Sequence, residues 1–203
     1  MRQIFPIVII IIATVIFLAF AAGGAFAATQ PDVENVRRML TAPDNQDLSV
    51  FDQDALVDVL VQIIENDPEE AEYHDRVVTC ALKALGSMHA PQAVDLLVAN
   101  LDKYPTTCLY WLGTYADVRA VDAITSRLED EDPSVRYEAA SALASIPFDE
   151  SCTGDSWRDV LYAAYTKLVE TKQLEDDEDV SEALSSATEH LLLGISNLDT
   201  SSD

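Results

Sequence analysis

Apolar residues recur every three or four positions along most of the chain, and polar residues fill the positions between them. Two clear examples are the segments 55–64 and 94–101. This spacing puts the apolar side chains on one face of an α-helix. Strand signals are missing, since the chain has no sustained alternation and no Asn-Gly or Asp-Gly hairpin turn. The pattern predicts an all-α protein of about nine helices with short connections.

Proline and glycine residues mark the expected helix boundaries. Pro31, Pro91 and Pro133 each stand where a helical segment would begin. Proline is tolerated there because its missing N–H would have no partner in the first turn. Gly86 and Gly113 follow apolar runs, and we expect both to end helices.

The segments 81–101 and 108–128 follow one pattern. Two unrelated amphipathic helices would share the apolar period, but not the same Leu-Gly end and the same Ala-Val-Asp start. Seven residues recur at a constant separation of 27 positions, namely Leu82, Leu85, Gly86, Ala93, Val94, Asp95 and Leu101, which correspond to Leu109, Leu112, Gly113, Ala120, Val121, Asp122 and Leu128. Residues 129–146 supply the next first helix, and its second helix begins late, near Trp157. The chain therefore contains a repeat of helix pairs.

This repeat resembles a known family. "DEDPSVRYEAASALASI" (130–146) is similar to the first helix of a HEAT repeat, and "PQAVDLLVANL" (91–101) and "VRAVDAITSRL" (118–128) are similar to the second. The short spacing resembles the compact HEAT-like repeats named after phycobilisome lyases. The resemblance is clear over 75–146 and loose over 31–172. It implies a right-handed α-solenoid, or superhelix, of about four HEAT-like helix pairs.

The resemblance weakens at residues 104–107, which lack the Val-Arg pair of the first helix. We therefore expect a short or irregular helix there. Within the same helix, Trp111 corresponds to Ala84 and Ala142 and is expected to pack in the core, whereas Tyr110 is expected to be exposed.

A stack of helix pairs needs a cap at its end. Residues 175–194 suit a C-terminal capping helix, because acidic residues in the first turn favour the helix N-terminus. Gly194 is expected to end this helix, and residues 195–203 are expected to form a disordered tail. The HEAT-like domain would then cover residues 28–194.

The first 27 residues have the pattern of a leader. Arg2 precedes a long apolar run, and Ala25-Phe26-Ala27 fits the small-x-small cleavage pattern of a signal peptide. Residues 1–27 are therefore expected to be a signal peptide, and the protein to be exported, periplasmic or secreted. The alternative is an uncleaved membrane anchor formed by residues 4–22, since the apolar run is long enough to span a bilayer.

The chain is strongly acidic, with 36 Asp and Glu against 12 Lys and Arg and a formal net charge of −24. Such a charge repels nucleic acid and anionic lipid headgroups. We therefore expect no nucleic-acid partner, and no membrane partner unless the leader stays uncleaved. The acidity fits either a well-solvated surface or adaptation to saline surroundings.

No arrangement of residues indicates a catalytic or metal site. His74, His89 and His190 lie far apart and without zinc-binding spacing. The acidic runs 129–132 and 175–179 lack the loop pattern that binds calcium. The chain has no Gly-rich phosphate loop and no Gly-x-Ser-x-Gly motif. The sequence predicts no catalytic residue, no metal and no cofactor.

The resemblance suggests where a partner would bind. In HEAT-like proteins the second helices line the concave side, which usually takes the partner. That assignment selects Gln92, Asp95, Arg119 and Asp122 as partner-binding residues, with Asp95 and Asp122 at equivalent positions in a ladder. The alternative is that these four are solvent-exposed polar positions without a ligand.

These features together favour an exported, non-enzymatic protein–protein interaction or scaffold module whose partner is another protein. Two alternatives stay open. One is an accessory or catalytic component of lyase-type chemistry, as in the phycobilisome-lyase HEAT-like proteins. The other is a structural element tethered to the membrane by its leader.

The chain has three cysteines, Cys80, Cys108 and Cys152. Cys80 and Cys108 occupy nearly equal heights in consecutive first helices, so a disulfide between them is one expectation. Neighbouring helix axes lie about 8–10 Å apart, whereas a disulfide needs Cα atoms within about 7 Å. Three thiols, or a bond to Cys152, are the alternatives.

Overall fold

The computed structural model describes residues 30–42, 47–148, 152 and 154–200. Within these ranges the chain forms nine α-helices and one short 3₁₀ helix, η1 (Leu48–Val50), and no strand. The predicted all-α class is therefore confirmed for the described residues. The expected signal peptide, residues 1–27, and the alternative anchor, residues 4–22, lie outside the described residues.

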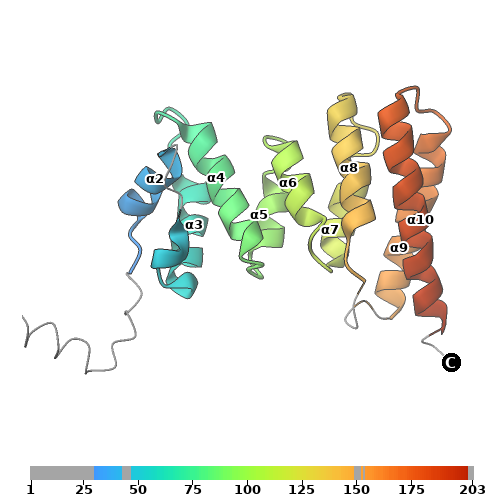
Figure 1. The fold of residues 1–203 in the computed structure, drawn as a ribbon, viewed down its shortest axis with the longest axis horizontal. Coiled ribbons are helices and arrows are strands. Elements are labelled where there is room, and N and C mark those ends of the chain that lie inside the picture. Colours follow the sequence, from blue (N-terminus) through green and yellow to red (C-terminus); the bar gives the residue numbers. More distant parts are fainter. Residues whose placement is uncertain (1–29, 43–46, 149–151, 153, 201–203) are drawn as a thin grey trace, which may run out of the picture.

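The helices follow one another along the long axis of the molecule, and the last two lie side by side at its far end (Figure 1). They are α2 (Val33–Thr41), α3 (Gln53–Asn66), α4 (His74–Ser87), α5 (Ala93–Ala99), α6 (Pro105–Leu112), α7 (Val118–Thr125), α8 (Pro133–Ser145), α9 (Asp155–Lys172) and α10 (Glu178–Thr200). The expected short helix is α6, which has 8 residues where α4 has 14 and α8 has 13. None of the described helices is both long and apolar enough to cross a membrane.

Contacts between the helices follow a regular order. Helices α2, α4, α6, α8 and α10 pack in succession, each on the next, and α5, α7 and α9 form a second succession. The two successions are joined within pairs, because α2 packs on α3, α4 on α5 and α6 on α7. Each helix therefore contacts mainly helices that are near to it in the sequence.

Aspartates begin several of these helices. The side chains of Asp32, Asp52, Asp117 and Asp132 accept hydrogen bonds of 2.8–3.0 Å from backbone N–H groups two or three residues further on. These bonds satisfy donors that the first helical turn leaves without partners. Part of the high aspartate content thus has a local structural use.

Corresponding residues of the two repeat copies are buried to the same extent. Leu85 and Leu112, which correspond in the repeat, are both 0% exposed, so their predicted burial is confirmed. Six of the seven corresponding pairs are buried in both copies, whereas Asp95 and Asp122 are exposed in both. The shared pattern of residues is therefore a shared pattern of core positions.

The two glycines of the repeat allow close helix contact. A Cβ atom added to Gly86 would lie 2.5 Å from Cγ of Trp111, and one added to Gly113 would lie 2.8 Å from Cα of Ala142. Trp111 and Ala142 correspond in the repeat, so each glycine meets the same position of the next first helix. The predicted helix end at Gly86 is wrong, because α4 continues to Ser87. The predicted end at Gly113 is confirmed.

The last helix is longer than the sequence suggested. Gly194 does not end it, because α10 continues to Thr200. A Cβ atom added to Gly194 would lie 2.7 Å from the ring of Phe148. Ile195 and Leu198 are 3% and 7% exposed, so the apolar stripe of the helix continues past the glycine. The expected disordered tail, residues 195–203, is therefore wrong for residues 195–200, and residues 201–203 lie outside the described part.

Candidate interaction surfaces

The four predicted partner-binding residues lie on the second helices or directly before them. Gln92 immediately precedes α5, Asp95 lies on α5, and Arg119 and Asp122 lie on α7. All four are exposed. Because Arg119 and Asp122 are three positions apart, they share one face of α7.

Arg119 is held by two aspartates. Its Nη2 atom lies 2.7 Å from Oδ2 of Asp117, and its Nη1 atom pairs with Asp95 of the neighbouring helix. The hydrogen bond from Arg119 lowers the pKa of Asp117, whose carboxylate also caps α7. An intramolecular pair therefore interrupts the expected aspartate ladder at Asp95. Exposed pairs of this kind contribute only about 0–1 kcal/mol, so they do not fix the surface strongly.

Gln92 belongs to a different hollow from the other three. It lines a groove of about 560 Å³ between α3 and the turn that joins α4 to α5. Asp95, Arg119 and Asp122 do not line this groove. The structure brings Asp95 and Arg119 into contact, but it does not gather all four predicted residues into one site.

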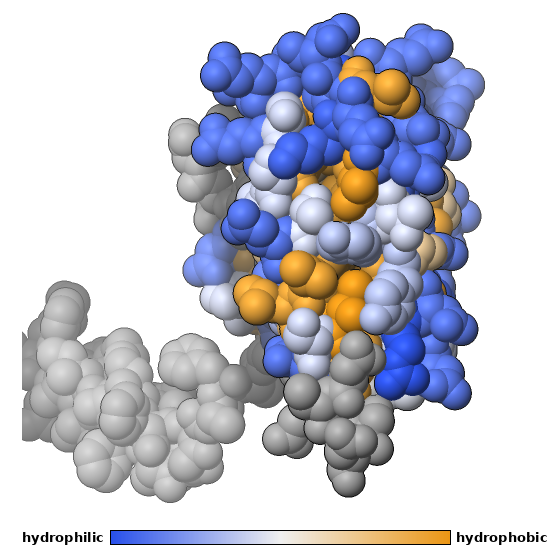
Figure 2. All heavy atoms as spheres, turned by 90° about the vertical axis from the view of Figure 1, so that its right-hand side faces the viewer, coloured by the Kyte–Doolittle hydropathy of each residue, from blue (hydrophilic) through white to orange (hydrophobic). Residues whose placement is uncertain are grey.

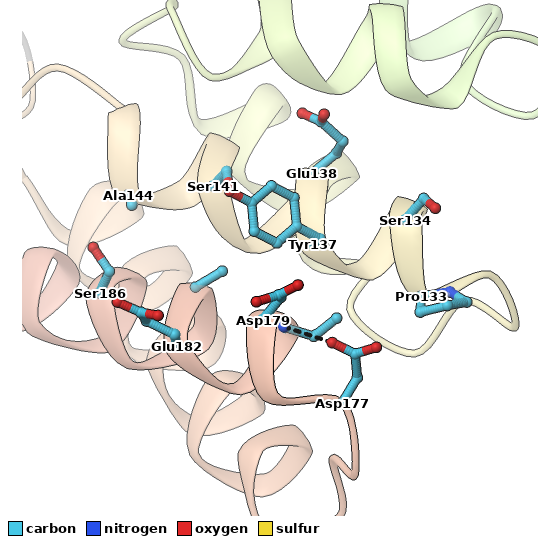
Figure 3. Close-up of a pocket in the computed structure, with 12 residues that line it drawn as sticks. Pro133, Ser134, Tyr137, Glu138, Ser141, Ala144, Asp177, Asp179, Glu182 and Ser186 are labelled. Atoms are coloured by element: carbon cyan, nitrogen blue, oxygen red, sulfur yellow. Dashed lines mark hydrogen bonds between the residues drawn. The ribbon is translucent and has the colours of Figure 1, made fainter.

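A second groove, of about 770 Å³, lies between α8 and α10 (Figure 3). We call it the α8–α10 groove. It is lined by Pro133, Ser134, Tyr137, Glu138, Ser141, Ala144, Asp177, Asp179, Val180, Glu182, Ala183 and Ser186. Sequence reasoning missed this groove, because its walls come from two segments that are far apart in the chain. The sequence signal that could have indicated this groove is Tyr137, an aromatic residue among polar neighbours.

A bidentate ion pair fixes one end of the α8–α10 groove. The Nε and Nη2 atoms of Arg136 on α8 donate to the two carboxylate oxygens of Glu175 at 2.8 and 2.9 Å. This hydrogen bonding lowers the pKa of Glu175, whose side chain is only 4% exposed. Asp177 then accepts a hydrogen bond of 3.1 Å from the backbone N–H of Val180 in α10. The start of α10 is thereby positioned against α8.

The first helix pair uses a related device. Arg37 of α2 donates through Nε to Oδ1 of Asp67 at 2.5 Å, directly after α3. His74 Nδ1 lies 3.0 Å from the other oxygen of Asp67, whose side chain is only 2% exposed. Arg37 and Arg136 each follow a buried valine of a first helix. Arg37 thus holds the segment that follows α3, and Arg136 holds the segment that follows α9.

The thiols and histidines do not assemble a reactive site in the described part of the chain. Cys108 is a free, fully buried thiol, and loss of solvation raises its pKa to about 12. The Cys80–Cys108 disulfide is therefore not formed in this structure. His190 lies inside α10, where its Nε2 atom is 2.8 Å from the carbonyl oxygen of Ile146. No group of three or more His, Cys, Asp or Glu side chains among the described residues could hold a metal ion.

The end of the molecule formed by α9 and α10 is a third surface. Figure 2 shows apolar and polar residues mixed on this face. Leu192 and Leu193 of α10 are 49% and 66% exposed. The last helix therefore presents apolar side chains to solvent, whereas the outer face of a terminal cap is usually polar.

Comparison with known families agrees with this architecture. Residues 81–103 match the family model of the PBS lyase HEAT-like repeat. The match covers the end of α4, the whole of α5 and the start of the next connection. Residues 81–103 therefore carry a HEAT-like repeat, as the sequence resemblance predicts. No curated protein and no solved structure matches the chain.

Proposed function

We propose that the chain is an exported, non-enzymatic protein-interaction or scaffold module built as a right-handed α-solenoid. Its four HEAT-like pairs would be α2 with α3, α4 with α5, α6 with α7 and α8 with α9, and α10 would be the cap. The observation that carries the proposal is the ordered packing of α2 on α3, α4 on α5 and α6 on α7, and of each of these pairs on the next, with α8 and α9 both packed on α10. Helix pairs stacked in this way present long exposed faces, which repeat proteins use for binding.

The partner in this proposal is another protein. A net charge of −24 disfavours phosphate backbones and anionic lipid headgroups. Two grooves and the second-helix side are open to solvent and offer carboxylates, an arginine and apolar side chains to a partner. Such mixed surfaces are typical of interfaces between proteins that also exist separately.

Export is the second component of the proposal. It is supported by the leader-like pattern of residues 1–27 and would place the protein in the periplasm or outside the cell. Mass spectrometry of the intact exported protein measures where the chain begins. A first residue of Ala28 supports cleavage, whereas an intact leader supports an anchor formed by residues 4–22.

Affinity capture followed by reconstitution tests the interaction module. The tagged chain is crosslinked in the exported fraction, and each captured protein is purified and titrated against it. The matched control is the Leu112→Glu variant. It puts a charge in place of a fully buried side chain and is therefore expected not to fold. We expect saturable binding to the folded chain alone. Equal capture by both chains, or no binding after purification, would show that the chain is not an interaction module.

A further inference from the structure

The floor of the α8–α10 groove is aromatic and apolar. Tyr137 is 43% exposed, and its ring lies in the groove between α8 and α10 (Figure 3). Ala144, Val180 and Ala183 add apolar lining. The face of a tyrosine ring attracts a cation such as a guanidinium or ammonium group.

The walls of the same groove are acidic. Glu138, Asp177, Asp179 and Glu182 line it, and no Lys or Arg does. The charge of Arg136 acts on Asp177 as well as on its partner Glu175, whereas Glu138, Asp179 and Glu182 form no ion pair within the described part of the chain. Their mutual repulsion is relieved by a positively charged occupant. The groove thus combines an aromatic floor with walls on which three carboxylates lack a cation.

The negative charge and the volume of the groove limit what can bind in it. A second copy of this chain carries the same charge of −24, and nucleic acid and anionic lipid are negative as well. A volume of about 770 Å³ falls within the range of about 300–1,000 Å³ that is typical of ligand pockets. It can therefore hold a few side chains of a protein segment.

We propose that the α8–α10 groove binds a segment of the partner protein that carries lysine or arginine beside apolar residues. The carboxylates of Glu138, Asp179 and Glu182 bind the basic groups of the segment, and the ring of Tyr137 stacks on one of these basic groups. This inference rests on the proposed function as an interaction module, and it specifies the chemistry of the partner.

The test uses the full-length chain in a mild non-ionic detergent and two labelled peptides of about ten residues. One peptide alternates Lys and Arg with Leu, and the other has Glu at every basic position. Fluorescence anisotropy measures binding at low and high NaCl. We expect saturable binding of the basic peptide, weakened by salt, and none of the acidic peptide. If the basic peptide fails to bind at low salt, the proposal is overturned.

A matched pair of triple variants locates the binding. The groove triple variant should weaken binding of the basic peptide at least tenfold. It combines Glu138→Gln, Asp179→Asn and Glu182→Gln. The control removes three exposed charges from α3 and α9, through Glu65→Gln, Asp159→Asn and Glu170→Gln, and should change binding less than about twofold. Equal weakening by both triple variants would mean that only the overall charge matters, and the groove would be rejected.

The aromatic part of the proposal has its own test. Tyr137→Leu should weaken binding of the basic peptide several-fold, because it keeps an apolar side chain but removes the ring. Tyr137→Phe keeps the ring and should bind like the original chain. The control is Tyr162→Leu on α9, since Tyr162 is 45% exposed and lies outside the groove. If Tyr137→Leu binds normally, the ring does not contact the basic group.

The captured partner separates this inference from the proposed function. If the partner binds the groove triple variant as well as it binds the original chain, the interaction module stands and the groove is rejected. Loss of partner binding in the groove triple variant, with binding by the α3 and α9 control intact, supports both the groove and the interaction module. If no partner binds the folded chain at all, the proposed function fails whatever the peptides do.

Discussion

At the scale of single residues, Gly113 shows how little space separates consecutive first helices. Alanine usually stabilises a helix relative to glycine by about 1 kcal/mol. Here a Cβ atom would lie 2.8 Å from both Cα and the carbonyl oxygen of Ala142. Backbone atoms cannot turn aside as a side chain can, so the two helices would have to separate.

We predict that Gly113→Ala destabilises the protein by about 1–3 kcal/mol, the usual cost of overpacking a core. Denaturant unfolding followed by circular dichroism measures this change. The control is Ser87→Ala, an exposed position in the last turn of α4, which should leave stability within about 0.5 kcal/mol. A stabilised Gly113→Ala variant would contradict the close contact.

The burial of Cys108 determines the reactivity of its thiol. Loss of solvation raises its pKa to about 12, so at pH 8 only about one thiol in ten thousand is the reactive thiolate. We predict that an alkylating reagent modifies Cys108 only after unfolding, and that the half-buried Cys80 reacts earlier. Peptide mapping of native and denatured samples measures both rates. Equal native rates for the two cysteines would show that Cys108 is not buried.

At the scale of elements, the short helix α6 depends on its buried leucines. Leu112 is 0% exposed, and α6 packs on α4, α5, α7 and α8. We predict that Leu112→Ala costs about 2–5 kcal/mol, because it leaves a cavity among helices that cannot fully close. Thermal unfolding measures the loss. An unchanged melting temperature would count against burial at this position.

The Arg136–Glu175 pair joins α8 to the start of α10, and it makes stability depend on pH. Hydrogen bonding from Arg136 lowers the pKa of Glu175 in the folded chain. The pair therefore contributes stability above the unfolded pKa of Glu, about 4.3, and loses it as pH falls through the lower folded pKa.

We predict that Glu175→Gln destabilises the protein by about 1.5–3 kcal/mol at pH 7, and that this difference shrinks at pH 3. Urea unfolding at the two pH values measures it. Glu170→Gln on α9 is the control, because Glu170 is exposed and forms no ion pair in the described part of the chain. A difference that stays constant with pH would exclude the charged pair as its cause.

At the scale of the whole molecule, self-repulsion opposes compactness. The net charge is −24, and several visible ion pairs, such as Asp95–Arg119, are exposed and therefore weak. Salt screens charges over a distance of about 10 Å at 0.1 M. We predict that the melting temperature rises between low and moderate NaCl. A fall over the same range would mean that specific ion pairs outweigh the repulsion.

Sequence patterns predicted positions that depend on local periodicity. The burial of Leu85 and Leu112, the exposure of Tyr110 at 61%, and the short helix α6 all follow from the repeat. Periodicity also contained the signal that was missed at the end of α10. Leu191, Ile195 and Leu198 continue the apolar stripe, and this stripe outweighs the helix-ending tendency of Gly194.

The helices, their repeat and the side that each helix buries follow from the sequence alone, because these depend on hydrogen bonds and apolar spacing within short segments. How the helices meet depends on tertiary packing. It pairs Arg119 with Asp95, sets Gly86 against Trp111, and opens the α8–α10 groove. Such contacts join residues more than twenty positions apart, and they depend on the distance and angle at which neighbouring helices pack, which no local pattern specifies.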